Sequence, residues 1–361
     1  MSDPTAAATC AACGRPAQPG DRFCEECGQP LAGRAAASTV QVPGRPVAPT
    51  GSAPCRECGG VIDADGYCAV CGAKAPNPRD HVVAQPQPWV AAVSDRGLRH
   101  VRNEDAAALS ADEEPGSRAV LVVCDGVSMS QDSDVASLAA AGAACRVLTS
   151  SRSQGLGSDS TAVAAMTTRL VAAADAASAA VTAATTPDHA DSPPSCTFVA
   201  AVVDRSRVVV GVVGDSRAYW LPDAGPAQVL TVDDSWAAEM VAAGLPRAQA
   251  ESGPQAHAIT RWLGVDAPDH TPTVTHLTVT SPGWLVVCSD GLWNYCSAPD
   301  DVAAALRQAA AGAHDEPLAT ASALVDWANA QGGRDNITVA LARLGTDLVA
   351  PAGHAQEELT A

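Results

Sequence analysis

Eight cysteines near the start of the chain repeat one spacing. Each of two units has a Cys-x-x-Cys pair, a spacer of nine or ten residues, and a second pair followed by glycine. The units contain Cys10, Cys13, Cys24 and Cys27, and then Cys55, Cys58, Cys68 and Cys71. Four thiolates on two such turns suit a tetrahedral zinc ion, and units this small need a metal to supply their folding energy. The spacing therefore predicts two structural Zn²⁺ sites.

Disulfide bonds are the alternative use of these cysteines. The first ten residues, MSDPTAAATC, contain neither the basic nor the apolar part of a secretory signal. We therefore expect a cytoplasmic location, where thiols persist. The sequence has no run of about 20 apolar residues, so we also expect no membrane span.

The formal net charge of −18 is concentrated in the later part of the chain. Residues 1–87 contain 8 acidic and 7 basic residues, whereas the rest contains 32 acidic and 15 basic residues. Non-specific binding to nucleic acid needs lysine and arginine to displace counterions. The charge thus argues against a nucleic-acid partner, although a DNA-binding ribbon is an alternative for the cysteine units.

Changes in composition divide the chain into parts. Stretches rich in Pro, Gly and Ala separate the cysteine units from each other and from a long C-terminal region. The expected parts are a first zinc ribbon at 1–34, a flexible linker at 35–54, a second zinc ribbon at 55–74, a Pro-rich linker at 75–88, a large domain at 89–345 and a disordered tail at 346–361.

The large domain alternates between short Val-rich runs, typical of buried strands, and longer Ala-rich stretches, typical of helices. The expected strands are residues 89–93, 119–124, 198–203, 208–213 and 284–288. The expected helices are residues 134–148, 161–183, 235–243, 300–311 and 317–330. Hairpin-length links between neighbouring strands favour antiparallel sheets, so we expect a layered α+β fold.

Two of the expected strands are followed by Asp-Gly, in Cys124-Asp125-Gly126 and Ser289-Asp290-Gly291. A carboxylate in that place is held at the edge of the core. Further acids occur in short polar motifs, namely Glu104, Asp105, Asp215 and Asp335. Hard oxygen ligands of this kind fit Mg²⁺ or Mn²⁺ better than zinc. Two such ions close together can activate a water and clamp a phosphoryl group.

Six motifs follow one another in the order found in the type 2C metal-dependent protein phosphatases. They are Ser94-Asp95-Arg96-Gly97 with Asn103-Glu104-Asp105, Val123-Cys124-Asp125-Gly126, VGDSRAY from Val213, Ile259-Thr260-Arg261, CSDGLW from Cys288 and GRDNIT from Gly333. Residues 89–344 therefore resemble the bacterial form of this family. The cysteine units resemble the double zinc ribbons of bacterial regulatory proteins.

The resemblance implies two stacked antiparallel sheets flanked by helices, an α-β-β-α sandwich preceded by two zinc ribbons. It implies hydrolysis of phosphoserine and phosphothreonine in protein substrates, opposing Ser/Thr kinases, with two or three Mn²⁺ or Mg²⁺ ions. The implied catalytic residues are Asp125, which would bridge two metals, and Asp290 and Asp335 at the second metal. The full implied ligand set is Glu104, Asp105, Asp125, Gly126 through its carbonyl, Asp215, Asp290 and Asp335. The ribbons would serve as an adaptor for a protein partner.

The chain departs from the family pattern in three places. His100 stands where bacterial members usually place a phosphate-binding arginine, with Arg99 and Arg102 on either side. Either a neighbouring arginine or a protonated His100 would then bind the phosphate; the alternative is an ordinary surface histidine. Val127-Ser128-Met129 replaces a glycine-rich sequence, and Ser195-Cys196-Thr197 replaces Gly-Thr-Thr. These changes affect the expected rate and substrate preference, while the metal-binding acids are all present.

Two hypotheses follow. The first is an active Ser/Thr protein phosphatase whose zinc ribbons target or regulate it. The second is a weakly active or inactive phosphatase fold that acts as a phosphoprotein-binding scaffold, and it is motivated by His100 and by Val127-Ser128.

Overall fold

The computed structural model describes residues 39–41, 54–55, 58–63, 66–73, 75, 77–150, 158–250, 252–253, 255 and 258–345. By contacts the chain divides into a unit at Met1–Ala37 and a unit at Ser38–Ala361. The first unit lies outside the described residues, as does the expected tail at 346–361. The expected first zinc site, with Cys10, Cys13, Cys24 and Cys27, therefore also lies outside them.

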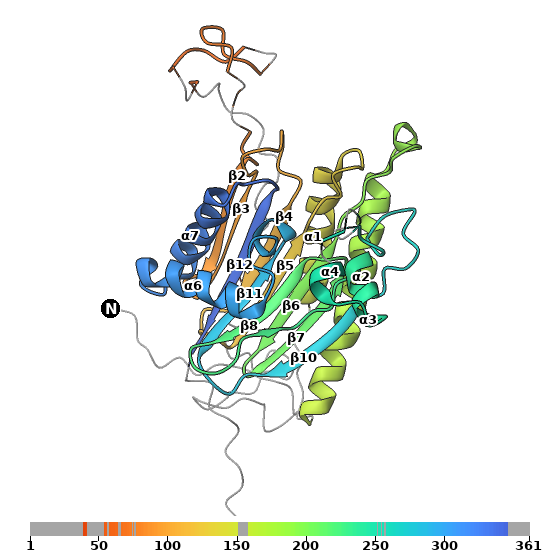
Figure 1. Cartoon of the computed structure of the whole chain (residues 1–361), viewed down its shortest axis with the longest axis vertical. Coiled ribbons are helices and arrows are strands. Elements are labelled where there is room, and N and C mark those ends of the chain that lie inside the picture. Colours follow the sequence, from red (N-terminus) through yellow and green to blue (C-terminus); the bar gives the residue numbers. More distant parts are fainter. Residues whose placement is uncertain are drawn as a thin grey trace, which may run out of the picture. The chain divides into compact units, whose positions relative to one another are not determined.

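In the described part of the chain the strands form two six-stranded sheets, and every pairing among them is antiparallel (Figure 1). In order across the first sheet, the strands are β1 (Thr39–Gln41), β4 (Ala106–Ala111), β5 (Arg118–Cys124), β6 (Phe198–Asp204), β7 (Arg207–Val213) and β10 (Thr273–Thr278). Across the second sheet they are β2 (His81–Gln87), β3 (Val90–Asp95), β12 (Ile337–Leu344), β11 (Gly283–Cys288), β8 (Arg217–Pro222) and β9 (Gln228–Val229).

Two pairs of long helices cover the outer faces of the two sheets. Helices α1 (Ser133–Thr149) and α2 (Asp159–Ala184) pack on the first sheet, and α6 (Pro299–Ala313) and α7 (Pro317–Ala330) pack on the second (Figure 1). Short helices lie in the connections, namely the 3-10 turn Pro187–His189, α3 (Trp236–Ala242), α4 (Arg247–Ala250) and α5 (Asp290–Trp293). The predicted α-β-β-α sandwich of antiparallel sheets is confirmed.

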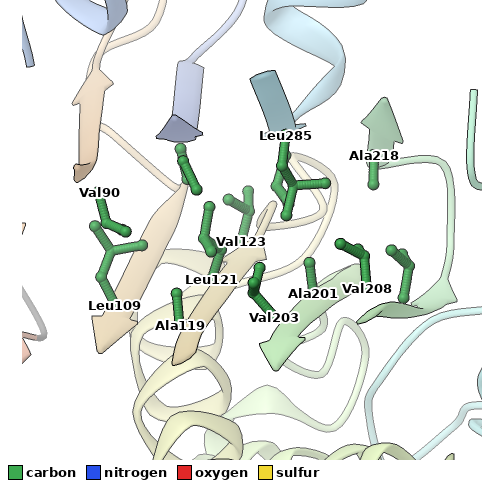
Figure 2. Packing of buried hydrophobic residues seen from close by; sticks show 14 of the residues in the cluster. Val90, Leu109, Ala119, Leu121, Val123, Ala201, Val203, Val208, Ala218 and Leu285 are labelled. Atoms are coloured by element: carbon green, nitrogen blue, oxygen red, sulfur yellow. The ribbon is translucent and has the colours of Figure 1, made fainter. Parts of the chain in front are cut away.

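The core consists of three apolar layers, one between the sheets and one beneath each helix pair. Strand β5 contributes to two of them because its side chains alternate between its faces. Leu121 and Val123 point into the layer between the sheets (Figure 2), whereas Val120 and Val122 pack against α1 and α2. Burial on both faces explains why this strand is an unbroken apolar run.

Two segments expected to be linkers contain strands. The Pro-rich segment 75–88 contains β2, which pairs with β3 at the edge of the second sheet, and segment 35–54 contains β1, which pairs with β4. Residues 81–87 are therefore part of the sandwich, which starts before the expected boundary at 89. Pro86 is compatible with a strand here because β2 is an edge strand whose register shifts between Ala84 and Gln87.

No helix within the described ranges is both long enough and apolar enough to cross a membrane.

Candidate functional site

The predicted acids meet at one end of the sandwich because each lies where a strand starts or stops. Asp125 follows β5, Asp215 follows β7 and Asp290 follows β11, whereas Asp105 precedes β4 and Asp335 precedes β12. Antiparallel pairing places the end of one strand beside the start of the next. Asp105 and Asp215 are buried, and Asp125, Asp290 and Asp335 are partly exposed.

Hydrogen bonds join the two sheets at this end. The Ser289 hydroxyl, which follows β11, donates to Asp105 Oδ2 before β4 at 2.7 Å. The main-chain N–H of Glu104 donates to Asn336 Oδ1 at 2.8 Å, across 232 residues of sequence. The acids are therefore brought together by the packing of one sheet on the other.

The carboxylates raise one another's pKa. Burial, and after it the charges of Asp105 and Asp290, raises the pKa of Asp125 well above its usual value. Burial and the neighbouring acids, Asp215 first, do the same for the pKa of Asp290. Burial raises the pKa of Asp105 to about 6 and that of Asp215 to about 7. A site with this much confined negative charge favours a divalent cation.

Two buried carboxylate oxygens at this site accept no hydrogen bond from any described residue, Asp105 Oδ1 and Asp290 Oδ1. A buried charged oxygen without a partner is costly, unless a cation completes it. Carboxylates are the ligands that Mg²⁺ and Mn²⁺ prefer. The residues present therefore fit the divalent metal centre that the sequence predicts.

Gly126 and Gly291 allow the motifs to pack closely around the acids. A Cβ on Gly126 would come within 2.7 Å of the Glu104 carbonyl oxygen. A Cβ on Gly291 would come within 1.9 Å of the Asn336 carbonyl oxygen. Close packing therefore requires glycine after each aspartate. This requirement is separate from the predicted role of the Gly126 carbonyl as a metal ligand.

The predicted phosphate-binding residues lie on the loop between β3 and β4. His100 Nε2 lies 3.2 Å from Asp335 Oδ1, and its Nδ1 lies 3.9 Å from Glu104 Oε2. Arg102 Nε donates to Glu104 Oε1 at 2.8 Å, and Arg99 is exposed. His100 is therefore next to two predicted metal ligands, which a surface histidine without a role would not require.

The Glu104 carboxylate is bound by an arginine and by a serine. Besides Arg102, the Ser133 hydroxyl at the start of α1 donates to Glu104 Oε1 at 2.7 Å. Ser137 donates to the Glu104 carbonyl oxygen at 2.5 Å. The first turns of α1 thus hold this residue in place.

The two segments near residues 127 and 195 that differ from the family pattern lie side by side. Val127 N–H donates to the Ser195 carbonyl oxygen at 3.0 Å. Thr197 N–H donates to the Asp125 carbonyl oxygen at 2.7 Å, and Asp125 N–H donates to the Thr197 hydroxyl at 3.0 Å. The threonine that the family pattern keeps is therefore the residue that holds Asp125.

Sequence reasoning missed the supports behind Asp215. The Arg217 guanidinium binds Asp233 through several hydrogen bonds, the shortest 2.6 Å, and lies 3.6 Å from the ring centre of Trp293. The Trp293 indole N–H donates to the Asp215 carbonyl oxygen at 3.0 Å. No local spacing in the sequence predicts the cluster of Arg217, Asp233 and Trp293. Arg217 and Trp293 nevertheless lie in motifs of the family resemblance.

The second cysteine unit forms a compact sulfur cluster. Cys55 Sγ lies 3.6 Å from Cys71 Sγ, and Cys58 Sγ lies 3.5 Å from Cys68 Sγ. All four sulfurs lie within 4.8 Å of one another and all are free thiols. Sulfurs about 2.3 Å from a tetrahedral zinc lie about 3.8 Å apart. Main-chain N–H groups of Cys71 and Val70 lower the pKa of Cys68 to about 6, whereas the pKa of Cys71 is raised to about 12 beside the other thiols, so the sulfurs do not ionise independently.

Comparison with known proteins assigns a family to each part of the chain. The model of the protein phosphatase 2C family matches residues 97–328, and the model of the double zinc ribbon family matches residues 10–72. The phosphatase match covers more than half of the chain, and it lies within the sandwich that holds the carboxylates. The chain therefore belongs to the protein phosphatase 2C family and carries a double zinc ribbon before that domain.

Individual relatives are bacterial phosphatases. The serine/threonine phosphatase stp of Listeria welshimeri is 32% identical over 148 residues, which is 40% of this chain and 55% of that protein. Protein phosphatase PhpP of Streptococcus pneumoniae is 33% identical over 151 residues, which is 41% of this chain and 57% of that protein. The chain thus matches little more than half the length of these relatives.

Solved structures of phosphatases share the fold. The Mycobacterium tuberculosis serine/threonine phosphatase PstP/Ppp superposes with a TM-score of 0.56 at 29% identity, covering 71% of this chain and 98% of that one. The catalytic domain of PstP in complex with two manganese ions gives a TM-score of 0.54 at 26% identity, covering 73% of this chain and 99% of that one.

Proposed function

We propose that this chain hydrolyses phosphoserine and phosphothreonine in proteins and so opposes Ser/Thr kinases. The observation that carries the proposal is the pair of buried, unpartnered oxygens of Asp105 and Asp290 within a cluster of mutually repelling carboxylates. A relative crystallised with two manganese ions supports the choice of metal.

The metal ligands in this proposal are the carboxylates of Glu104, Asp105, Asp125, Asp215, Asp290 and Asp335 and the carbonyl of Gly126. When bound, the ions would supply an activated water and neutralise the charge of the phosphoryl group. Asp125, Asp290 and Asp335 would hold the two catalytic ions, and Asp215 would hold a third. Thr197 keeps Asp125 in position through two hydrogen bonds.

Binding of the phosphate is assigned to His100, Arg99 and Arg102. Arg102 is kept in the mouth of the site by Glu104, with its side chain 43% exposed and thus open to a ligand. His100, whose Nε2 lies 3.2 Å from Asp335 Oδ1, adds a second side chain at the same place. An arginine and a histidine therefore take the place of the single arginine expected there.

The zinc ribbons have a separate role in this proposal, that of an adaptor that binds a protein partner. The four thiols of the second ribbon suit one zinc ion, and a second ion is proposed for Cys10, Cys13, Cys24 and Cys27. Zinc thiolates are compatible with the reducing cytoplasm, where we place the protein.

Phosphate release from a phosphoserine peptide by the full chain, titrated with Mn²⁺, tests the proposal. Asp290→Asn should lower kcat/KM at least about 100-fold, because even groups that only support a metal ligand commonly contribute 10- to 100-fold. Asp300→Asn, at an exposed position in the first turn of α6, is the matched control and should keep full activity.

Equal activity of the Asp290→Asn variant and the wild-type protein would contradict the proposal. Absence of Mn²⁺-dependent hydrolysis, together with retained binding of the phosphopeptide, would favour the scaffold hypothesis instead.

A further inference from the structure

Residues 77–80, between the second zinc ribbon and β2, form a turn. In this connector, residues 77–80, Asn77 N–H donates to Asp80 Oδ2 at 3.2 Å and Asp80 N–H donates to the Asn77 carbonyl oxygen at 2.8 Å. Arg79 N–H also donates to Asn77 Oδ1 at 3.0 Å. These reciprocal bonds fix the direction in which the Arg79 side chain leaves the turn.

The Arg79 guanidinium reaches the back of the metal centre. Its Nη2 donates to the Asp105 carbonyl oxygen at 2.9 Å, and its Nη1 donates to the Asp134 carbonyl oxygen in the first turn of α1 at 2.6 Å. The Asp134 carboxylate lies 3.8 Å from Nη1, and the Arg79 side chain is only 13% exposed. One side chain thus holds both a predicted metal ligand and the helix that supports Glu104.

The Asn103–Asp105 motif in turn binds the main chain of Arg79. Asn103 donates from its amide nitrogen to the Arg79 carbonyl oxygen at 3.0 Å, and its amide oxygen accepts from Asp105 N–H at 3.2 Å. Asn103 is 2% exposed. The connector and the Asn103–Asp105 motif therefore interlock through two side chains.

The connector also touches the proposed phosphate-binding loop. Arg96 N–H donates to the Asp80 carbonyl oxygen at 2.8 Å, and Arg96 Nε lies 3.6 Å from Asp80 Oδ1. Arg96 Nη1 in turn donates to the His100 carbonyl oxygen. Neighbouring residues of the connector thus support the metal ligands on one side and the phosphate loop on the other.

We propose that Arg79 is a positioning residue for the metal centre, supplied by the connector that follows the zinc ribbon. It acts through the Asp105 main chain, whose carboxylate it aligns by fixing its carbonyl oxygen. The second ribbon is thereby linked to the metal centre over a short stretch of chain, since Cys71 precedes Arg79 by eight residues. This proposal rests on the proposed metal-dependent phosphatase function.

Three variants of the full chain test the proposal: Arg79→Met, Arg79→Lys and the matched control Arg118→Met. Arg118 also donates to a main-chain oxygen of α1, that of Leu148, at 2.7 Å, but at the other end of the helix. Calorimetry measures Mn²⁺ binding, and tryptophan fluorescence measures the melting temperature. Hydrolysis of an aryl phosphate gives two separate quantities, kcat and the Mn²⁺ concentration for half-maximal activity.

We expect Arg79→Met to weaken Mn²⁺ binding about tenfold or more, as for other groups that support a metal ligand. Arg79→Lys should recover part of the affinity, because one ammonium can bind only part of what the guanidinium binds. Arg118→Met should lower the melting temperature with Mn²⁺ affinity unchanged. Wild-type Mn²⁺ affinity in Arg79→Met, or an equal loss in Arg118→Met, overturns the proposal.

If Arg79→Met does not fold, Arg79→Lys decides, and unaltered Mn²⁺ affinity in that variant overturns the proposal. Failure of the wild-type protein to hydrolyse any phosphate ester would instead overturn the proposed function. The calorimetric titration separates these two failures, because it reports on the metal centre without turnover.

Discussion

The second zinc ribbon and the carboxylate centre both suit metal cations, but they are assembled over very different lengths of chain. The paired sulfurs of Cys55 and Cys71 are 16 residues apart and lie 3.6 Å from each other. In the carboxylate centre, Glu104 is bonded to Asn336 across 232 residues. One site is made by a local turn and the other by two packed sheets.

The two sites therefore differ in what the metal does for the fold. Among the described residues of the ribbon, only Cys55 and Cys68 are buried, so zinc is part of its folding energy. The carboxylates are held by three apolar layers and need the cation mainly to offset their charge. In the described ranges, the four sulfurs are also the only potential ligand cluster of three or more groups whose atoms all lie within 4.8 Å.

The largest predicted effect is loss of the ribbon fold. Cys68→Ser should remove one equivalent of zinc per chain and expose residues 55–73 to protease, because structural zinc contributes about 10–16 kcal/mol in small zinc-binding peptides. The sandwich should melt as before. Tryptophan fluorescence reports on it selectively, since all seven tryptophans lie after residue 88. Metal analysis, limited proteolysis and fluorescence melting check these three outcomes.

Cys145→Ala is the control, because Cys145 is buried in α1 away from the sulfur cluster, and its zinc content should equal that of the wild-type protein. Unchanged zinc in Cys68→Ser would contradict the assignment of a zinc ion to this cluster. A large shift of the tryptophan transition would show that the ribbon and the sandwich do not fold independently.

A smaller effect is expected from the supports of the carboxylate centre. Arg217 is paired with Asp233 and covers Trp293, with both charged side chains nearly buried. Arg217→Met leaves the Asp233 charge without its partner, so we expect a loss of about 3–5 kcal/mol in the free energy of unfolding. Urea unfolding followed by tryptophan fluorescence measures it.

Arg343 offers a matched control for Arg217. It pairs with Asp223 at 2.6 Å and lies over Trp284 at 5.2 Å, but its side chain and that of Asp223 are more exposed. Arg343→Met should therefore cost only about 0–1 kcal/mol. Similar losses in the two variants would contradict the claim that the support of Asp215 is a buried, strongly coupled one.

The sequence predicted the parts of the molecule whose signal is local. Strand β5 is an unbroken apolar run, and the Cys-x-x-Cys pairs carry their own spacing, so both were found. Strand β4, with the sequence AAALSA, was missed because alanine favours helices in isolation, and only its pairing with β5 and β1 makes it a strand. Strand β2 was missed because its proline resembles a linker.

In the candidate site, too, residues with a local sequence signal were predicted and residues without one were missed. The acids at strand ends were named in advance from their motifs and from the family resemblance. The supports were not, because the Arg79 contact with Asp105 spans 26 residues and that of Arg217 with Asp233 spans 16, with no repeating spacing between them. Such pairs are decided by how the connector and loops pack, which composition and periodicity do not encode.

The last prediction concerns the response of the carboxylate centre to pH. In the folded chain the pKa of Asp105 is raised to about 6 and that of Asp215 to about 7, from a usual value of 3.8. Between about pH 4 and 7 the folded chain therefore binds more protons than the unfolded chain, so its stability falls as the pH rises. Without divalent metal, the tryptophan-detected melting temperature should fall by several degrees from pH 5 to pH 8. With Mn²⁺ the fall should shrink, because the cation replaces the protons, and Asp215→Asn should also make it shallower. A melting temperature that rises with pH in the metal-free protein would mean that the carboxylates are not confined as described.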